Sequence, residues 1–239
     1  MNVAPDFFET TFLGFSYLVP SISDEQQQKY YSSVFRNINI QGVALLPQES
    51  RASLYFLDKD LVQFFEPDFA KIFVVKSVSN VTEIDFVRCL SLLSQYKKDG
   101  TANYIARSYK PQMEKYYEEY IYSVVADTDD KYGQFSTTFP AKKYDDRYQN
   151  LQQALNSLEI KKEFPSIIDL DVYFFGLIYT IVFENKTMDF IRKEELKNEI
   201  DTKIAAFRKD PSHIKAPSNL GHLRARISSS IEIYQKYAS

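Results

Sequence analysis

The stretch at residues 166–183, SIIDLDVYFFGLIYTIVF, decides the fold class. It is apolar on almost every side over about five helical turns, with Asp169 and Asp171 as its only charges. A helix that is apolar all round is typical of the centre of a globular domain. The uncharged part, residues 172–183, is too short to span a bilayer. The stretch therefore predicts a buried central helix and no membrane association.

Further helical patterns surround this stretch. Apolar residues recur at spacings of three and four, which is the period of an amphipathic helix. Asn80 and Glu83 have the spacing of a capping box, which predicts that one of these helices begins there. Phe12–Pro20 is rich in aromatic and β-branched residues and predicts a strand. We expect a mainly α fold, a multi-helix bundle with a short N-terminal β element, whose helices lie at 81–93, 111–124, 144–158, 196–207 and 218–237.

Composition narrows the class of protein. The 239 residues are 44% hydrophobic and 26% charged, which is typical of a globular chain. The six glycines are too few for a glycine-rich phosphate loop or a turn-rich β-sandwich. The single cysteine, Cys89, lies in an apolar pattern and is interpreted as a core residue in a reducing compartment. The first residues have no apolar signal segment, so a soluble, cytoplasmic protein is expected.

Charge is distributed unevenly along the chain. Residues 1–70 hold nine acids and four bases, whereas residues 192–239 hold ten bases and six acids. A basic C-terminal region is compatible with nucleic-acid binding, and also with ordinary mixed-charge helix surfaces. Tyr116, Tyr117 and Tyr120 present the same choice, because tyrosines stack on bases, but helical spacing favours the core for Tyr117 and Tyr120.

One segment carries a family resemblance. Residues 34–54 read VFRNINIQGVALLPQESRASL. The segment resembles part of the ParB/sulfiredoxin-like domain of GmrSD-type modification-dependent restriction enzymes. There, a helix ending in Phe-x-x-Ile-Asn leads through Gly-x-x-Leu to a Gln-Glu-x-Arg helix start. Residues 221–227, GHLRARI, resemble the closing helix of that domain. The matching positions of the first segment are Phe35, Ile38, Asn39, Gly42, Leu45, Gln48, Glu49 and Arg51.

The resemblance does not extend to the catalytic motif of the family. Its nucleotide-hydrolysing signature is Asp-Gly-x-Gln-Arg, which occurs nowhere in this chain. The family's nuclease partner uses a histidine-based metal site, and the only histidines here are His213 and His222. We interpret these two as surface residues and expect no metal and no cofactor. The resemblance implies a partial ParB-like element at 1–57 and a helical bundle at 58–239, with a loop or boundary at 127–143.

The candidate site residues have two interpretations. Asn39, Glu49 and Arg51 form either a capped helix–turn–helix or the rim of a site that faces a nucleotide or nucleic-acid phosphate. Arg224 and Arg226 are the candidate nucleic-acid-facing residues.

Three functions follow as hypotheses. The first is a non-catalytic or catalytically incomplete helical module of a restriction or phage-defence-like protein, which binds DNA or a partner subunit that supplies the missing half. The second is a nucleotide-hydrolysing enzyme whose site contains Asn39, Glu49 and Arg51. The third is a helical protein–protein interaction protein. We expect the chain to have no complete enzymatic activity alone.

Overall fold

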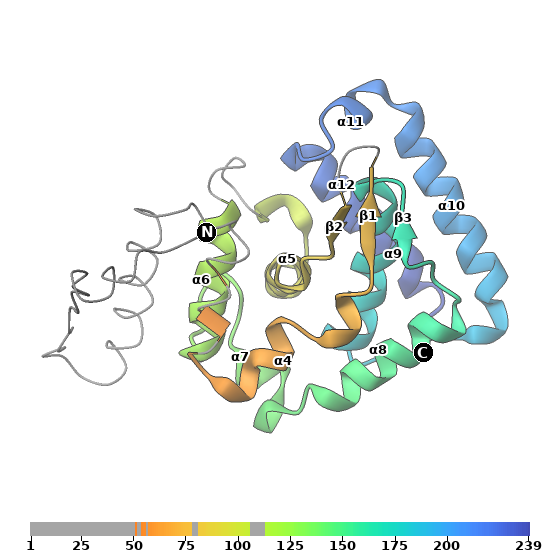
Figure 1. Cartoon of the computed structure of the whole chain (residues 1–239). Coiled ribbons are helices and arrows are strands. Elements are labelled where there is room, and N and C mark those ends of the chain that lie inside the picture. Colours follow the sequence, from red (N-terminus) through yellow and green to blue (C-terminus); the bar gives the residue numbers. More distant parts are fainter. Residues whose placement is uncertain (1–50, 52–53, 56, 78–80, 106–112) are drawn as a thin grey trace, which may run out of the picture. The chain divides into compact units, whose positions relative to one another are not determined.

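The structure is a computed structural model that describes residues 51, 54–55, 57–77, 81–105 and 113–239 (Figure 1). All of them belong to one compact unit, Leu45–Ser239. This unit is mainly helical with a small sheet, which confirms the predicted fold class. The predicted strand Phe12–Pro20 lies outside the described residues, as do Asn39 and Glu49.

Helices form most of the unit. Arg51, Leu54 and Tyr55 are also helical. The helices with full bounds are α4 (Val62–Phe65), α5 (Phe86–Asp99), α6 (Met113–Val125), α7 (Phe135–Thr138), α8 (Asp145–Ser157), α9 (Ile167–Ile178), α10 (Lys193–Lys209), α11 (Pro211–Lys215) and α12 (Leu220–Gln235). Among the described residues, none of the helices combines the length and the apolar character needed to cross a membrane.

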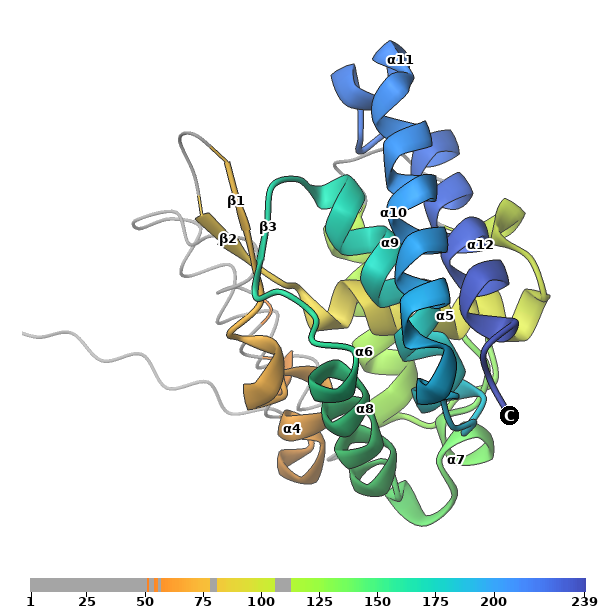
Figure 2. The same cartoon turned by 90° about the vertical axis from the view of Figure 1, so that its right-hand side faces the viewer.

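Helix α9 lies at the centre, as the apolar stretch predicts, and continues into a π-helical turn, Tyr179–Phe183. It packs along α12 and α10 (Figure 2). At Gly176 the two backbones approach so closely that a Cβ atom would lie 2.3 Å from the carbonyl oxygen of Ser230. The Ser230 hydroxyl accepts from the Gly176 N–H at 2.6 Å and donates to the Val172 carbonyl at 2.7 Å. This contact fixes the position of α12 along α9.

An aromatic cluster surrounds Phe64 of α4. Its ring lies 5.0–5.9 Å, centroid to centroid, from five other rings, which are those of Phe65, Phe135, Phe139, Tyr144 and Tyr148. Such edge and stacked contacts stabilise a core beyond their buried area. Segment 127–143 contains α7 and contributes Tyr132, Phe135 and Phe139 to the core. Tyr116, Tyr117 and Tyr120 are buried too, so the core interpretation of Tyr117 and Tyr120 is confirmed.

A three-stranded sheet lies beside α5, in the order β2-β1-β3, with β1 (Val74–Lys76), β2 (Val81–Glu83) and β3 (Glu163–Phe164). β1 pairs antiparallel with β2 and parallel with β3. The predicted capping box at Asn80 and Glu83 is wrong, because residues 81–83 are a strand. Helix α5 begins at Phe86 instead, where the Asp85 carboxylate accepts the Arg88 N–H at 3.2 Å.

Candidate functional site

Two groups of charged side chains meet in the interior, where α5, α6, α9 and α12 come together. We call Arg51, Asp85 and Glu114 the acid-rich cluster, because two carboxylates share one guanidinium. We call Arg88, Asp171 and Arg226 the arginine-rich cluster, because two guanidinium groups share one carboxylate. The two clusters are adjacent in sequence on α5, since Asp85 is its N-cap and Arg88 lies in its first turn.

In the acid-rich cluster, Arg51 is completely buried. Its two terminal nitrogens donate to Asp85 at 3.2 and 2.6 Å, and its Nε donates to Glu114 at 2.6 Å. The guanidinium also lies 5.1 Å from the centre of the Tyr117 ring. Burial lowers the pKa of Arg51, but the charge and hydrogen bonds of Asp85, together with the charges of Tyr55 and Glu114, more than offset this, and the net shift is upward. Arg51 therefore stays charged and holds its helix against α5 and α6.

The carboxylates of this cluster are placed by their helices. Asp85 caps α5, and Glu114 lies in the first turn of α6, where the helix dipole favours a negative charge. Their side chains are 17% and 37% exposed, so solvent stabilises the surplus negative charge. Partial burial raises the pKa of Glu114, an effect that the charge of Arg51 opposes.

The arginine-rich cluster is deeper. Arg88 holds both oxygens of Asp171, at 2.6 and 2.8 Å, and Arg226 donates its Nε to the same carboxylate at 2.9 Å. Asp171 and Arg226 are fully buried, and the side chain of Arg88 is 16% exposed. Arg226 also donates to the Pro217 carbonyl at 2.7 Å. Both arginines are thereby oriented by specific acceptors, but the cluster has two cations for one anion.

The pKa shifts reflect this imbalance. Burial lowers the pKa of Arg88, whereas the charge of Asp171 and its hydrogen bonds to Arg88 raise this pKa. The net shift is upward. Burial lowers the pKa of Arg226 as well, and here Asp171 does not restore it, because Arg88 adds repulsion. The arginine-rich cluster thus carries one surplus positive charge in a desolvated position.

His213 completes the surroundings of Arg226. Its Nε2 lies 2.8 Å from a terminal nitrogen of Arg226, and its ring stacks on His222 with 4.3 Å between centroids. The interpretation of His213 as a surface residue is wrong, because it is buried. Burial, then Arg226 and His222, lower its pKa to about 4. At neutral pH His213 is uncharged and accepts a hydrogen bond from Arg226, so it does not offset the surplus charge.

The structure also brings together Asp210, His213 and His222, with one ligand atom of each within 4.8 Å of the others. His222 is oriented by its Nδ1, 3.0 Å from the Ala216 carbonyl, and its Nε2 lies 3.4 Å from the Ser212 hydroxyl. His213 does not fit. An arginine can only donate, so Nε2 of His213 must accept and its Nδ1 carries the proton. Coordination by His213 would require loss of the Arg226 hydrogen bond.

A cavity of about 690 Å³ is lined by residues of both clusters. These are Arg88 and Arg226 of the arginine-rich cluster and Glu114, at the start of α6, of the acid-rich cluster. The rest of its wall is mainly aliphatic and comes from the first turns of α6, α9 and α12, with Met113, Ile167, Leu220 and Leu223. A cavity of this size, mostly apolar with a few charged groups, has the properties of a small-molecule site.

The structure places three of the five predicted site residues among those it describes. Arg51 is the anchor of the acid-rich cluster. Arg224 donates to the Ile105 carbonyl at 3.1 and 2.8 Å, and Arg226 is buried between Asp171 and His213. A phosphate would therefore reach Arg226 only through the cavity. The prediction that Asn39, Glu49 and Arg51 face one phosphate stays a prediction.

Asp85, Arg88 and Glu114 were not predicted as site residues, and Asp171 was noted only as a charge within the apolar stretch. One signal was present. Asp171 and Arg226 are charges inside otherwise apolar helical patterns, and such residues are almost never fully buried unless they are paired.

Cys89, on α5 beside Arg88, is the described thiol, and burial raises its pKa to about 12. A thiol with such a pKa is protonated at neutral pH and is a poor nucleophile.

Comparison with known proteins gives no relatives: no family model, no curated protein and no solved structure matches the chain.

Proposed function

We propose that this chain is a helical module without a complete catalytic site, from a restriction or phage-defence-like system, and that it binds a partner subunit supplying the catalytic half. The observation that carries the proposal is the position of Arg51. This residue closes the Gln-Glu-x-Arg element of the segment resembling the ParB-like domain, and its guanidinium is held by Asp85 and Glu114 of the helical unit. Arg51, at the end of that motif, is thereby anchored in the helical unit.

The chemistry of the other reactive side chains supports a binding role over a catalytic one. His213 is neutral, buried and engaged by Arg226, so it is not poised to exchange protons near pH 7. The Cys89 thiol is protonated. Arg51 has both ends of its guanidinium committed to carboxylates, which compete with any phosphate for the same donors.

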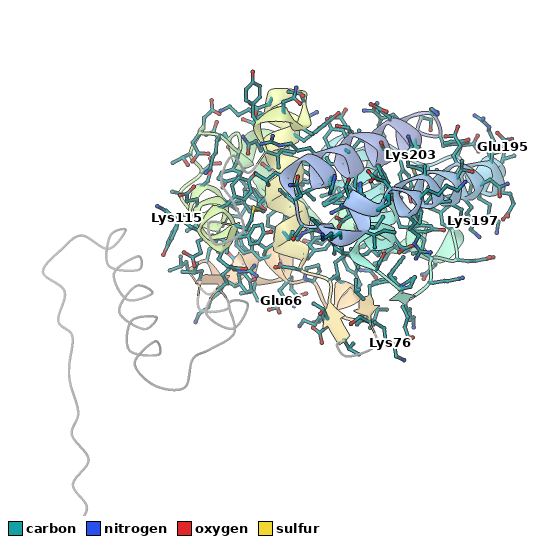
Figure 3. All side chains as sticks on the ribbon, turned by 90° about the horizontal axis from the view of Figure 1, so that it is seen from above. Glu66, Lys76, Lys115, Glu195, Lys197 and Lys203 are labelled. Carbon is teal, nitrogen blue, oxygen red and sulfur yellow. The ribbon has the colours of Figure 1, made fainter. Side chains whose placement is uncertain are left out.

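The charge distribution favours a protein partner over DNA. Acids from earlier in the chain neutralise the basic C-terminal region: Glu159 holds Lys193, Asp169 holds Arg208, and Asp171 holds Arg226. The labelled lysines of Figure 3 are dispersed, with Lys115 on α6 far from Lys197 and Lys203 on α10. DNA-binding surfaces concentrate positive charge along one face.

Two measurements test the proposal. Purified chain is mixed with the product of a neighbouring gene that carries the Asp-Gly-x-Gln-Arg motif, and association is followed by size-exclusion chromatography with light scattering. Hydrolysis of ATP and GTP is measured for each protein and for the mixture. We expect a stable complex and no turnover by this chain alone. Absence of a complex with any such product contradicts the proposal.

The variant Arg51→Gln distinguishes the module from the alternative enzyme. If Arg51 is an anchor, it stabilises the folded chain, and we expect its replacement to lower the temperature at the midpoint of thermal unfolding. The matched control is Arg192→Gln, which removes an exposed arginine paired with Glu195. Nucleotide turnover by the wild-type chain that disappears in a folded Arg51→Gln variant, but not in Arg192→Gln, establishes the enzyme and overturns the proposed function.

A further inference from the structure

The cavity between the two clusters has walls of opposite charge. The arginine-rich cluster has two cations and one anion around Asp171, and the acid-rich cluster has two anions and one cation around Arg51. Arg88 and Arg226 of the first cluster and Glu114 of the second line the cavity. We propose that this cavity binds a monoanionic carboxylate with an aliphatic body, and that Arg88 is the residue that holds the carboxylate.

Arg88 has the donors that this role requires. Each of its terminal nitrogens donates one N–H to Asp171, at 2.6 and 2.8 Å, and carries a second N–H; the neighbouring Cys89 sulfur also accepts a hydrogen bond from Arg88. Its guanidinium is kept in place by the Phe175 ring, 5.1 Å from the ring centre. Because the side chain is 16% exposed and also lines the cavity, a ligand can reach these groups without displacing Asp171.

The charge balance selects a monoanion. A single negative charge neutralises the surplus at Arg88 and Arg226, where solvent screens little. A second negative charge would be uncompensated and would lie in the same cavity as the Glu114 carboxylate. An ammonium group has only Glu114 to bind, and that carboxylate is 37% exposed and already accepts from Arg51 at 2.6 Å. The deeper, desolvated cationic wall therefore dominates recognition.

The apolar wall selects the body of the ligand. Met113, Ile167, Leu220 and Leu223 are aliphatic, and Tyr117 is the aromatic side chain of the wall. Burial of aliphatic carbon in such a cavity contributes about 0.8 kcal/mol for each methylene group. A medium-length acyl chain ending in a carboxylate satisfies both walls. The cavity shares Glu114 with the anchor of Arg51, but binding of a small carboxylate and binding of a partner subunit are measured separately.

Isothermal titration calorimetry on the full chain tests the proposal, with octanoate as the probe and octan-1-ol, octylammonium and octyl phosphate as matched ligands. We expect one saturable octanoate site, and at least about tenfold weaker binding of the other three. Equal affinity for octanoate and octan-1-ol overturns the role of the arginines. Tighter binding of octyl phosphate than of octanoate overturns the selection of a monoanion.

Two variants locate the site, with Arg192→Gln as the control that leaves octanoate affinity unchanged. Arg88→Met removes the carboxylate partner and is expected to weaken octanoate at least about tenfold. Glu114→Gln keeps an acceptor for Arg51, removes the opposing charge, and is expected to tighten octanoate by about threefold. A folding defect does not tighten binding. If Arg88→Met does not fold, the octanoate affinity of Glu114→Gln therefore still tests the proposed site. Unchanged or weaker octanoate binding by Glu114→Gln contradicts the proposal.

Discussion

The two clusters face the same cavity and have the same number of charged groups, but they differ in depth. In the acid-rich cluster the surplus charge belongs to Asp85 and Glu114, which are partly exposed. In the arginine-rich cluster the surplus belongs to Arg88 and Arg226 around a fully buried Asp171. An unpaired charge at an exposed position destabilises the fold little, because water solvates it. An unpaired charge at a buried position needs a counter-charge. The difference indicates which wall recognises a ligand and which one joins parts of the fold.

The largest effect is expected from Asp171→Asn. It leaves two buried guanidinium groups without their shared carboxylate, and removing one partner of a buried ion pair costs about 4 kcal/mol. The free energy of unfolding in urea measures the loss. Asp68→Asn, at an exposed aspartate paired with Lys71, is the control and is expected to cost less than about 0.5 kcal/mol. Similar losses for the two variants would contradict the assigned depth of the arginine-rich cluster.

The second-largest effect is expected at Gly176, where α9 and α12 cross. This crossing brings Asp171 on α9 close to Arg226 on α12. Gly176→Ala places a Cβ atom against the backbone of Ser230 and forces the helices apart, at a cost of about 3 kcal/mol. Denaturant unfolding gives the value. At Gly221, in the first turn of α12, a Cβ would meet no backbone atom, only the side chain of Asn219 at 3.2 Å. Gly221→Ala is therefore the control, and equal costs at the two glycines would be inconsistent with the close approach.

A smaller effect is expected from pH, through His213. Its pKa falls from 6.5 to about 4 in the folded protein, so the unfolded chain takes up the proton first as the pH decreases. Stability from the neutral imidazole is complete above pH 6.5 and is lost progressively toward pH 4. The loss at pH 5 is about 2 kcal/mol. Urea unfolding at successive pH values measures it, and His213→Gln should flatten that part of the profile. If stability still falls as steeply between pH 6.5 and pH 4 in this variant, the pH dependence does not come from His213.

The smallest effect is expected in the acid-rich cluster. Glu114→Gln keeps the hydrogen bond to Arg51 and removes a charge from a partly exposed position, so the stability changes by less than about 1 kcal/mol. Thermal unfolding compares this variant with Asp171→Asn. A loss as large as that of Asp171→Asn would remove the distinction between the two clusters.

The helices were predictable because their signal is local. Apolar spacings of three and four predicted α6, α8, α10 and α12 to within a few residues, and the stretch that is apolar on almost every side predicted α9. The sheet was not, because strands of two or three residues are too short for alternation to be recognised, and Val81–Glu83 was interpreted as part of a helix.

The site depends on contacts between distant positions, which a single sequence does not pair. Asp171 lies 83 residues from Arg88 and 55 from Arg226, and Arg51 lies 63 residues from Glu114. The individual charges were visible, and Arg51 and Arg226 were selected as candidates. Their partners became apparent only through the packing of α5, α6, α9 and α12.

The most direct test of the proposed carboxylate site is a titration of the full chain with octanoate, followed by NMR of the arginine Nε–Hε groups. Arg88→Lys and Arg51→Lys variants assign the two resonances. We predict a saturable shift of the Arg88 resonance, with that of Arg51 unchanged, because the ligand neutralises only the buried surplus positive charge. A shift of Arg51 with Arg88 unaffected, or no saturable shift of either, would contradict it.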